Sequence, residues 1–302
     1  MARDKRTARF RYEEVREAAI LALFDGRLAE AVRGLERAAG IARTTGDADL
    51  IAIALANLAL AAIESGTSPP APALLREALG RSREPTSRFF CAWSLSKLYL
   101  ESHDARKATF YAHVAYQLAP RQYLACAEQS LGIILLARGD YRRALAHLRR
   151  ALEDWPLDKA PIALSSSALA YLWSLMGDRR EAGRAIETTL AHLGDLDGGY
   201  PACYRHEVHL SLGFSLLELE EPERAFHHAE RALEALAGID QRPRHEHKMA
   251  LYLAAHAALD AGSADAGSHY ADQLQGTYYP GLAGIRDLLV AVRTCGMVNW
   301  LA

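Results

Sequence analysis

Residues 128–156 read EQSLGIILLARGDYRRALAHLRRALEDWP and contain two helical segments separated by a turn. In both segments apolar residues recur three and four positions apart, the spacing of one face of an α-helix. The pattern breaks at Gly139, and Pro156 ends the second segment. Small residues (Gly132, Ala144 and Ala151) stand where two antiparallel helices have to approach each other closely. The segment therefore predicts a helical hairpin.

The same arrangement of a turn residue and a small residue five positions later recurs along the chain. Successive turns are separated by 36 to 43 residues. Because elements repeated at a fixed period are typical of helical arrays, the period predicts a chain built from stacked hairpins. The turn and small residues are Gly26 and Ala31, Gly66 and Ala71, His103 and Ala108, Gly139 and Ala144, Gly177 and Ala182, Glu220 and Ala225, and Gly262 and Gly267.

Residues 128–156 resemble the tetratricopeptide repeat, whose pattern is W-x2-L-G-x2-Y, then A-x3-F, then P. Leu131, Gly132, Ala144 and Pro156 match it, while Glu128 replaces the Trp and leucines replace both aromatic residues. The resemblance implies an all-α fold, a right-handed α-α superhelix (solenoid) of about seven helix-turn-helix repeats. The predicted solenoid covers residues 1–302, with repeats at 11–46, 47–86, 87–121, 122–157, 158–197, 200–240 and 243–279 and a capping helix at 281–296.

The composition excludes several classes of protein. Half of the residues are apolar and the net charge is −2, which is typical of a folded globular chain. No apolar run reaches the roughly 18 residues of a membrane span. The four cysteines lie far apart without a CxxC pair, so neither a disulfide framework nor a zinc site is expected. We therefore expect a cytoplasmic protein with free thiols.

In tetratricopeptide repeat proteins the first helix of each hairpin lines a concave groove. Applying that rule here gives aromatic side chains with isolated polar groups between them, the composition expected of a peptide-binding groove. The alternative for each aromatic residue is packing between neighbouring helices. The predicted partner-binding residues are Asn57, Phe90, Trp93, Lys97, Gln129, Tyr171, Phe214, Tyr252 and His256.

One subfamily can be tested on the residues. The repeats that clamp the C-terminal carboxylate of chaperones require five Lys, Asn or Arg side chains. Asn57 matches one position and Arg16 can stand for a second, but Ile20, Phe90 and Ser94 occupy the others. These three side chains cannot donate charged hydrogen bonds, so a clamp of this kind is not expected.

Charge is divided unevenly along the chain. Residues 1–150 carry 23 Lys and Arg against 16 Asp and Glu, or +7, whereas residues 151–302 carry 12 against 21, or −9. Such a division can steer an acidic partner or favour head-to-tail self-association, or it can reflect solvated outer faces alone. Because the basic residues are dispersed, neither a nucleic acid nor a membrane is an expected partner.

Nine of the twelve histidines follow residue 190. His206 and His209 lie one turn apart, but position 210 is Leu, so the zinc-peptidase motif HExxH is not formed. The other pairs fall in different segments without a cysteine. We expect no metal and no cofactor, although a response to pH near neutrality is conceivable for neighbouring imidazoles.

The motifs of the common enzyme classes do not occur: there is no phosphate-binding loop, no GxSxG and no GxGxxG. Only His256 and Asp260, one helical turn apart, suggest a catalytic pair. The sequence therefore predicts a non-catalytic scaffold or adaptor that binds a protein or peptide segment in its groove. The alternative is a regulatory sensor subunit, a peptide- or ligand-responsive member of the same repeat class.

Overall fold

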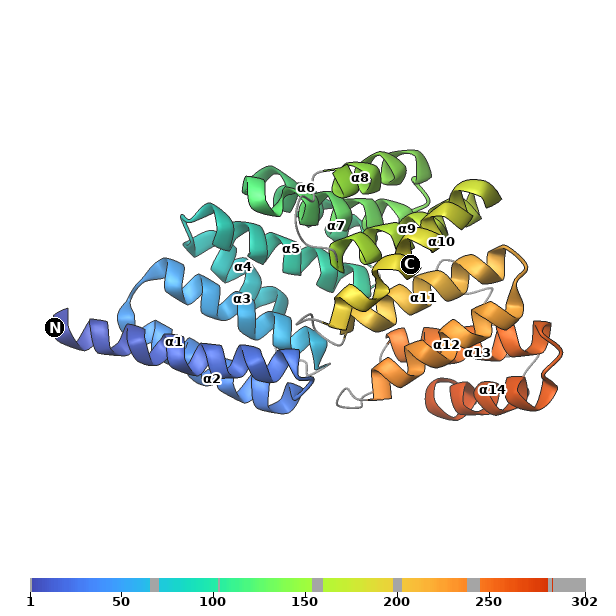
Figure 1. Cartoon of the computed structure of the whole chain (residues 1–302). Coiled ribbons are helices and arrows are strands. Elements are labelled where there is room, and N and C mark those ends of the chain that lie inside the picture. The colour runs from blue at the N-terminus through green and yellow to red at the C-terminus, as the bar shows by residue number, and fades with distance from the viewer. Residues whose placement is uncertain are drawn as a thin grey trace. The chain divides into compact units, whose positions relative to one another are not determined.

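The computed structural model describes residues 2–65, 71–102, 104–153, 160–197, 203–237, 245–281 and 284. Fourteen α-helices and two short 3-10 helices occur in these ranges, and no strand (Figure 1). The all-α prediction is thus confirmed. The helices are α1 (Ala2–Phe24), α2 (Leu28–Thr45), α3 (Ala48–Glu64), α4 (Ala71–Arg81), α5 (Pro85–Glu101), α6 (Ala105–Leu118), η1 (Arg121–Tyr123), α7 (Leu124–Ala137), α8 (Tyr141–Glu153), α9 (Ala160–Leu175), α10 (Arg179–His192), η2 (Leu193–Asp197), α11 (Cys203–Glu218), α12 (Pro222–Ala237), α13 (His245–Asp260) and α14 (Ala264–Tyr278).

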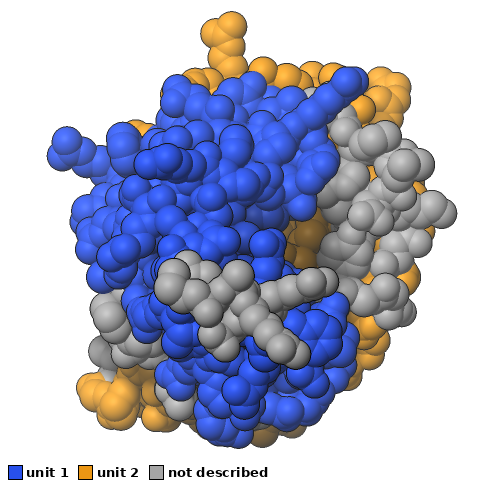
Figure 2. Space-filling model, turned by 90° about the vertical axis from the view of Figure 1, so that its left-hand side faces the viewer, with its two compact units in different colours: residues 1–134 blue, residues 135–302 orange. Residues whose placement is uncertain are grey.

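The chain divides into two compact units, residues 1–134 and 135–302, which Figure 2 shows in different colours. In unit 1, α1 packs on α2, α3 on α4 and α5 on α6, while α2 contacts α3 and α4 contacts α5. In unit 2, α9 packs on α10, α11 on α12 and α13 on α14, while α9 contacts α11 and α12 contacts α13. Within each unit, then, consecutive helices form hairpins that stack on the next hairpin.

The turns follow the sequence pattern closely. At the described turn positions the backbone is left-handed, with φ between 62° and 78° at Gly26, Gly139, Gly177, Glu220 and Gly262. After each of these residues, the next backbone N–H donates to the carbonyl five positions earlier; Arg27 to Ala22 is 2.8 Å and Asp178 to Trp173 is 3.0 Å. This Schellman geometry satisfies the carbonyls at the end of the first helix. The predicted turn register is confirmed at these five positions.

At the start of several second helices, a side chain accepts a hydrogen bond from a backbone N–H group that has no partner within the helix. Asp178 Oδ1 accepts a hydrogen bond from the Glu181 N–H at 3.1 Å, and Asp104 Oδ1 accepts one from the Lys107 N–H at 3.1 Å. A left-handed residue followed by an N-capping Asp both ends one helix and begins the next within a few residues.

The core consists of small and aliphatic residues. Ala31, Ala108, Ala144, Ala182 and Ala225, the small residues five positions after the turns, are all fully buried. Without a bulky side chain at that position, the two helices of a hairpin approach closely. This explains why the pattern requires a small residue there.

The N-terminal boundary differs from the prediction. The first repeat was expected to begin at residue 11, after a basic segment, but α1 begins at Ala2 and continues without interruption to Phe24. The segment is rich in Arg, Glu and Ala, which are good helix formers, so the first helix extends through it.

Two further expectations are not tested. The capping helix at 281–296 lies outside the described residues, apart from residues 281 and 284. One solenoid over residues 1–302 and the other repeat bounds stay predictions. α3 contains a long run of apolar residues, and Ala52, Leu55 and Ala59 on it are fully buried. Within the part of the chain that the structure describes, no helix combines the length and the apolar character that crossing a membrane requires.

Candidate functional site

Five of the predicted partner-binding residues lie in unit 1, and all five are half-buried: Asn57, Phe90, Trp93, Lys97 and Gln129. We call these five residues, together with Tyr123, the aromatic face. Positions 90, 93 and 97 lie three and four residues apart along α5 and therefore share one side of the helix. Asn57 comes from α3, which contacts α5, and Gln129 comes from α7.

The rings of the aromatic face hold one another in place. The centroid of the Phe90 ring is 4.9 Å from that of Tyr123 and 6.2 Å from that of Trp93, and both contacts are edge-to-face. Behind them, the fully buried ring of Phe89 stacks on Tyr123 at 5.5 Å. Packed pairs of this kind contribute about 0.5–1.5 kcal/mol beyond the area they bury. The cluster is consequently a fixed, partly buried group of aromatic rings packed against the core.

The thiol next to this cluster is not available for chemistry. Cys91 is fully buried, and burial raises the pKa of its thiol to about 12. Because the thiolate is the reactive form, this cysteine is a packing residue.

Three other predicted partner-binding residues, all in unit 2, are buried. Tyr171, Phe214 and Tyr252 are 0%, 3% and 5% exposed. Their rings contact one another in a row from α9 to α11 to α13. The ring centroids of Tyr171 and Phe214 are 6.1 Å apart, and those of Phe214 and Tyr252 are 6.2 Å apart. The three rings were predicted to line a binding surface, but they are buried and do not present such a surface. They pack between consecutive first helices, the alternative that the sequence left open.

His256, the last of the set, lies on α13 with its side chain 15% exposed. Its ring centroid is 5.8 Å from that of Tyr252, and its Nδ1 is 3.4 Å from Oδ2 of Asp260. The Asp260 side chain is 53% exposed. The two side chains thus contact each other along one side of the helix, one turn apart, and they form an ion pair when His256 is protonated.

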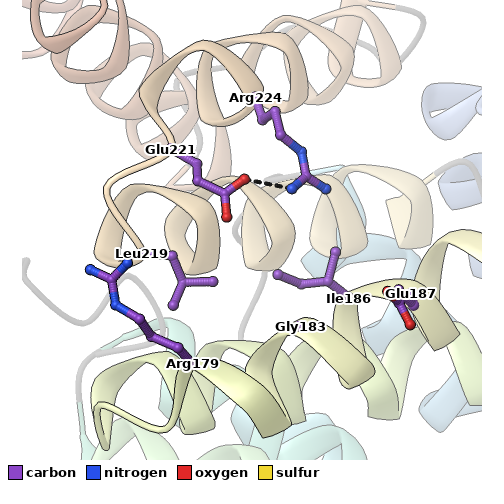
Figure 3. Close-up of a pocket in the computed structure, with 7 residues that line it drawn as sticks. All are labelled: Arg179, Gly183, Ile186, Glu187, Leu219, Glu221 and Arg224. Carbon is purple, nitrogen blue, oxygen red and sulfur yellow. Dashed lines mark hydrogen bonds and ion pairs between the residues drawn. The ribbon is translucent and has the colours of Figure 1, made fainter.

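Two cavities beside α12 are formed by described residues of unit 2. The smaller has a volume of about 150 Å³ and is shown in Figure 3. Three of its four charged side chains form ion pairs: Arg224 lies 2.5 Å from Glu221, and Arg179 lies 2.9 Å from Glu220, which does not line the cavity. Glu187 is the fourth. Leu219 and Ile186 are its apolar lining residues, so the space is small and bears both signs of charge.

The larger cavity, about 590 Å³, is lined mainly by basic side chains. Positions 224, 227, 228 and 231 lie three and four residues apart on one side of α12, and positions 205 and 209 do so on α11. We call it the Arg-His cavity. Its lining residues are Arg205, His209, Arg224, His227, His228 and Arg231, with Leu190, Leu193 and Gly194.

The Arg-His cavity was not predicted from the sequence, where the histidines were considered only as neighbours along the chain and as metal ligands. The spacing of Arg and His residues three and four positions apart on α12 is the pattern that indicates a shared basic side of this helix. In the described ranges, no group of three or more His, Cys, Asp and Glu side chains could hold a metal ion.

Two imidazoles of the cavity are bonded to each other. His209 and His228 are 7% and 6% exposed, and their Nδ1 atoms are 2.9 Å apart. Burial, and after it the electrostatic effect of His228 and nearby cations such as Arg231, lowers the pKa of His209 to about 3. Burial and neighbouring cations lower the pKa of His228 to about 4. Both rings are therefore neutral at pH 7, and one donates its Nδ1 proton to the other.

Comparisons with known proteins agree with the fold. No protein-family model matches the chain, and no curated protein matches it. Among solved structures, a tetratricopeptide repeat protein from Parabacteroides merdae is 16% identical, with a TM-score of 0.56 over 93% of this chain and 98% of its own. A Rap protein complexed with competence and sporulation factor is 15% identical, with a TM-score of 0.66 over 93% of this chain and 76% of its own.

The Cut9-Hcn1 hetero-tetramer of the APC/C is 14% identical, with a TM-score of 0.63 over 94% of this chain and 50% of that chain. At these identities the likenesses show the fold. The chain has the helical-repeat solenoid fold of tetratricopeptide repeat proteins, which confirms the resemblance seen in residues 128–156.

Proposed function

We propose that this protein is a non-catalytic adaptor that binds a protein segment, extended or helical, on the aromatic face of unit 1. One observation carries the proposal: Phe90 and Trp93 are only partly buried, pack against the buried ring of Phe89 and share one side of α5 with the ammonium group of Lys97. Aromatic anchors surrounded by a few hydrogen-bonding groups are typical of energetically important centres in interfaces.

The fold supports the same function. Repeat solenoids present extended surfaces that bind other chains. Two of the similar structures were solved in assemblies, the Rap protein with competence and sporulation factor and Cut9 with Hcn1. We extend this by analogy to a protein or peptide partner for this chain, with the cytoplasm as the proposed location and no part for nucleic acid or membrane.

A library of displayed peptides provides the test. Peptides selected on the full chain should lose at least tenfold in affinity for Trp93→Ala, because truncating an interface anchor costs about 2 kcal/mol or more. Phe110→Ala is the matched control, since Phe110 is a 61% exposed aromatic residue on α6, a second helix. Binding that depends on Phe110 as strongly as on Trp93, with both variants folded by circular dichroism, would refute the proposed surface.

Self-association through the oppositely charged halves stays a separate prediction. Sedimentation equilibrium at low and high salt tests it, because association through exposed charges weakens as ionic strength rises. A monomer at every salt concentration would contradict it.

A further inference from the structure

The Arg-His cavity brings six nitrogen-bearing side chains around one space. Three guanidinium groups, from Arg205 on α11 and from Arg224 and Arg231 on α12, surround it together with the imidazoles of three histidines. Among the described residues that line the cavity, none has a carboxylate. A concave space walled by one sign of charge focuses the field and attracts the opposite charge.

Two of the three arginines also pair with a carboxylate outside the cavity. Glu221 pairs with Arg224 at 2.5 Å and Glu234 pairs with Arg231, and neither Glu lines the cavity. A guanidinium has five N–H donors in a planar fork, so a carboxylate on one edge leaves donors for a second anion. The arrangement holds the arginines in place while their remaining donors can point to a ligand.

The imidazole pair adds a group that can take up charge. Because His209 and His228 share one proton between their Nδ1 atoms, the donor ring has a free place for a proton on Nε2. Protonation of this Nε2 atom leaves the hydrogen bond between the two Nδ1 atoms intact. An anion in the cavity favours this protonation, since it offsets the repulsion from the arginines.

Apolar side chains complete the lining of the cavity. Leu190 and Leu193, at the end of α10 and the start of η2, line the same space, and Leu190 is 41% exposed. The volume of about 590 Å³ far exceeds that of a single inorganic anion and lies in the range of small-molecule sites. The cavity therefore combines basic and apolar side chains.

We propose that the Arg-His cavity binds a small organic phosphate, with the phosphate group against Arg205, Arg224, Arg231 and the histidine pair, and the organic part against Leu190 and Leu193. Arg is the side chain best suited to a phosphate, because its fork forms two parallel hydrogen bonds with phosphate oxygens. The site is distinct from the aromatic face, which lies in unit 1. If the protein is a regulatory sensor, the alternative function considered from the sequence, this cavity is where it binds its small ligand.

Phenyl phosphate, inorganic phosphate and phenol are the probes, titrated into the full chain at pH 7 and followed by NMR of the histidine ring C–H signals. We expect phenyl phosphate to shift the His209 and His228 signals and to bind about tenfold tighter than inorganic phosphate, because its ring leaves water. Phenol should not bind. If phenol binds as well as phenyl phosphate, or if phenyl phosphate leaves both signals unmoved at millimolar concentration, the proposal is wrong.

Variants distinguish a built site from general attraction to positive charge. Arg231→Gln should weaken phenyl phosphate about ten- to hundredfold, the effect of losing a hydrogen bond to a charged group. Arg184→Gln is the matched control, because Arg184 is a half-exposed residue of α10 that is paired with Glu181 at 2.6 Å and does not line the cavity. Equal weakening in both variants would overturn the site, as would equal binding in both.

A second readout comes from proton uptake. Binding enthalpies measured in buffers of different ionisation enthalpy should show uptake of up to one proton when phenyl phosphate binds, and this uptake should disappear in His209→Gln. Uptake that persists unchanged in His209→Gln contradicts the part given to the histidine pair.

Discussion

Gly34 on α2 lies where α1 and α2 approach each other closely. A Cβ added to Gly34 would lie 2.6 Å from the Cβ and 3.4 Å from the Cα of Ala19 on α1. Ala19 is 4% exposed, and its methyl group is fixed to the backbone, so no change of rotamer can make room. The substitution Gly34→Ala must therefore move one helix away from the other.

The size of the effect follows from this distance. Two carbon atoms pack at about 3.5–4.0 Å, so the helices must separate locally by about 1 Å. Overpacking of this kind costs about 1–3 kcal/mol. Replacing Gly by Ala inside a helix contributes about 1 kcal/mol in the other direction. Gly34→Ala should thus lower the free energy of unfolding by about 0–2 kcal/mol.

Gly40 provides the matched control on the same helix. It is exposed, and an added Cβ would meet nothing within 4 Å, so Gly40→Ala should raise the free energy of unfolding by about 1 kcal/mol. The difference between the two variants, about 1–3 kcal/mol, isolates the packing cost because the helix propensity cancels. Urea denaturation followed by circular dichroism measures it.

The reasoning would be refuted if Gly34→Ala proved as stable as Gly40→Ala. Adding Ala19→Gly to Gly34→Ala tests the contact itself, because it removes the opposing methyl group. The double variant should be more stable than the two single changes predict when their effects are added. Strict additivity would show that the two positions do not touch.

Two more predictions concern unit 2. The free energy of unfolding should fall as the pH drops from about 6.5 towards 4, by on the order of 2 kcal/mol per ring at pH 5, because the folded-state pKa values of His209 and His228 (about 3 and about 4) lie below the unfolded value. The pair is faced by other cationic or basic groups that oppose its protonation, namely Arg205, Arg224, Arg231 and His227. His209→Gln should reduce the dependence of the free energy of unfolding on pH, whereas His269→Gln, at an exposed position, should not. Equal pH dependence in the two variants, measured by denaturation at several pH values, would contradict the assignment. Glu220→Gly should raise the melting temperature, because a non-glycine residue at φ 62° costs about 1–2 kcal/mol and the ion pair with Arg179 that it loses is exposed; a lower melting temperature would show that the pair outweighs the backbone strain.

The sequence predicted the helices and their turns well because both are local. A turn residue with φ near 70°, a small residue five positions later and apolar spacing of three and four act over a few residues. They hold even at position 220, where Glu takes the left-handed conformation that Gly has in the other described turns. The all-α class and the hairpin register therefore follow from the residues alone.

Exposure was not predictable in the same way. Phe90 and Tyr171 both belong to first helices and were both placed in the groove, but Phe90 is partly buried and Tyr171 is 0% exposed. The outcome depends on residues of the neighbouring hairpins: the ring of Phe214 on α11, some 40 residues away, packs against Tyr171, whereas the ring of Tyr123 packs against Phe90.

The Arg-His cavity shows the same limit. The spacing on α12 places four basic side chains on one side of a helix, but it does not indicate what faces them. Only the packing of α11 against α12 brings Nδ1 of His209 to within 2.9 Å of Nδ1 of His228 and leaves a space beside them. The sequence determined the helices and where they turn. The tertiary structure decided which side chains meet, because that depends on contacts between residues distant in the chain.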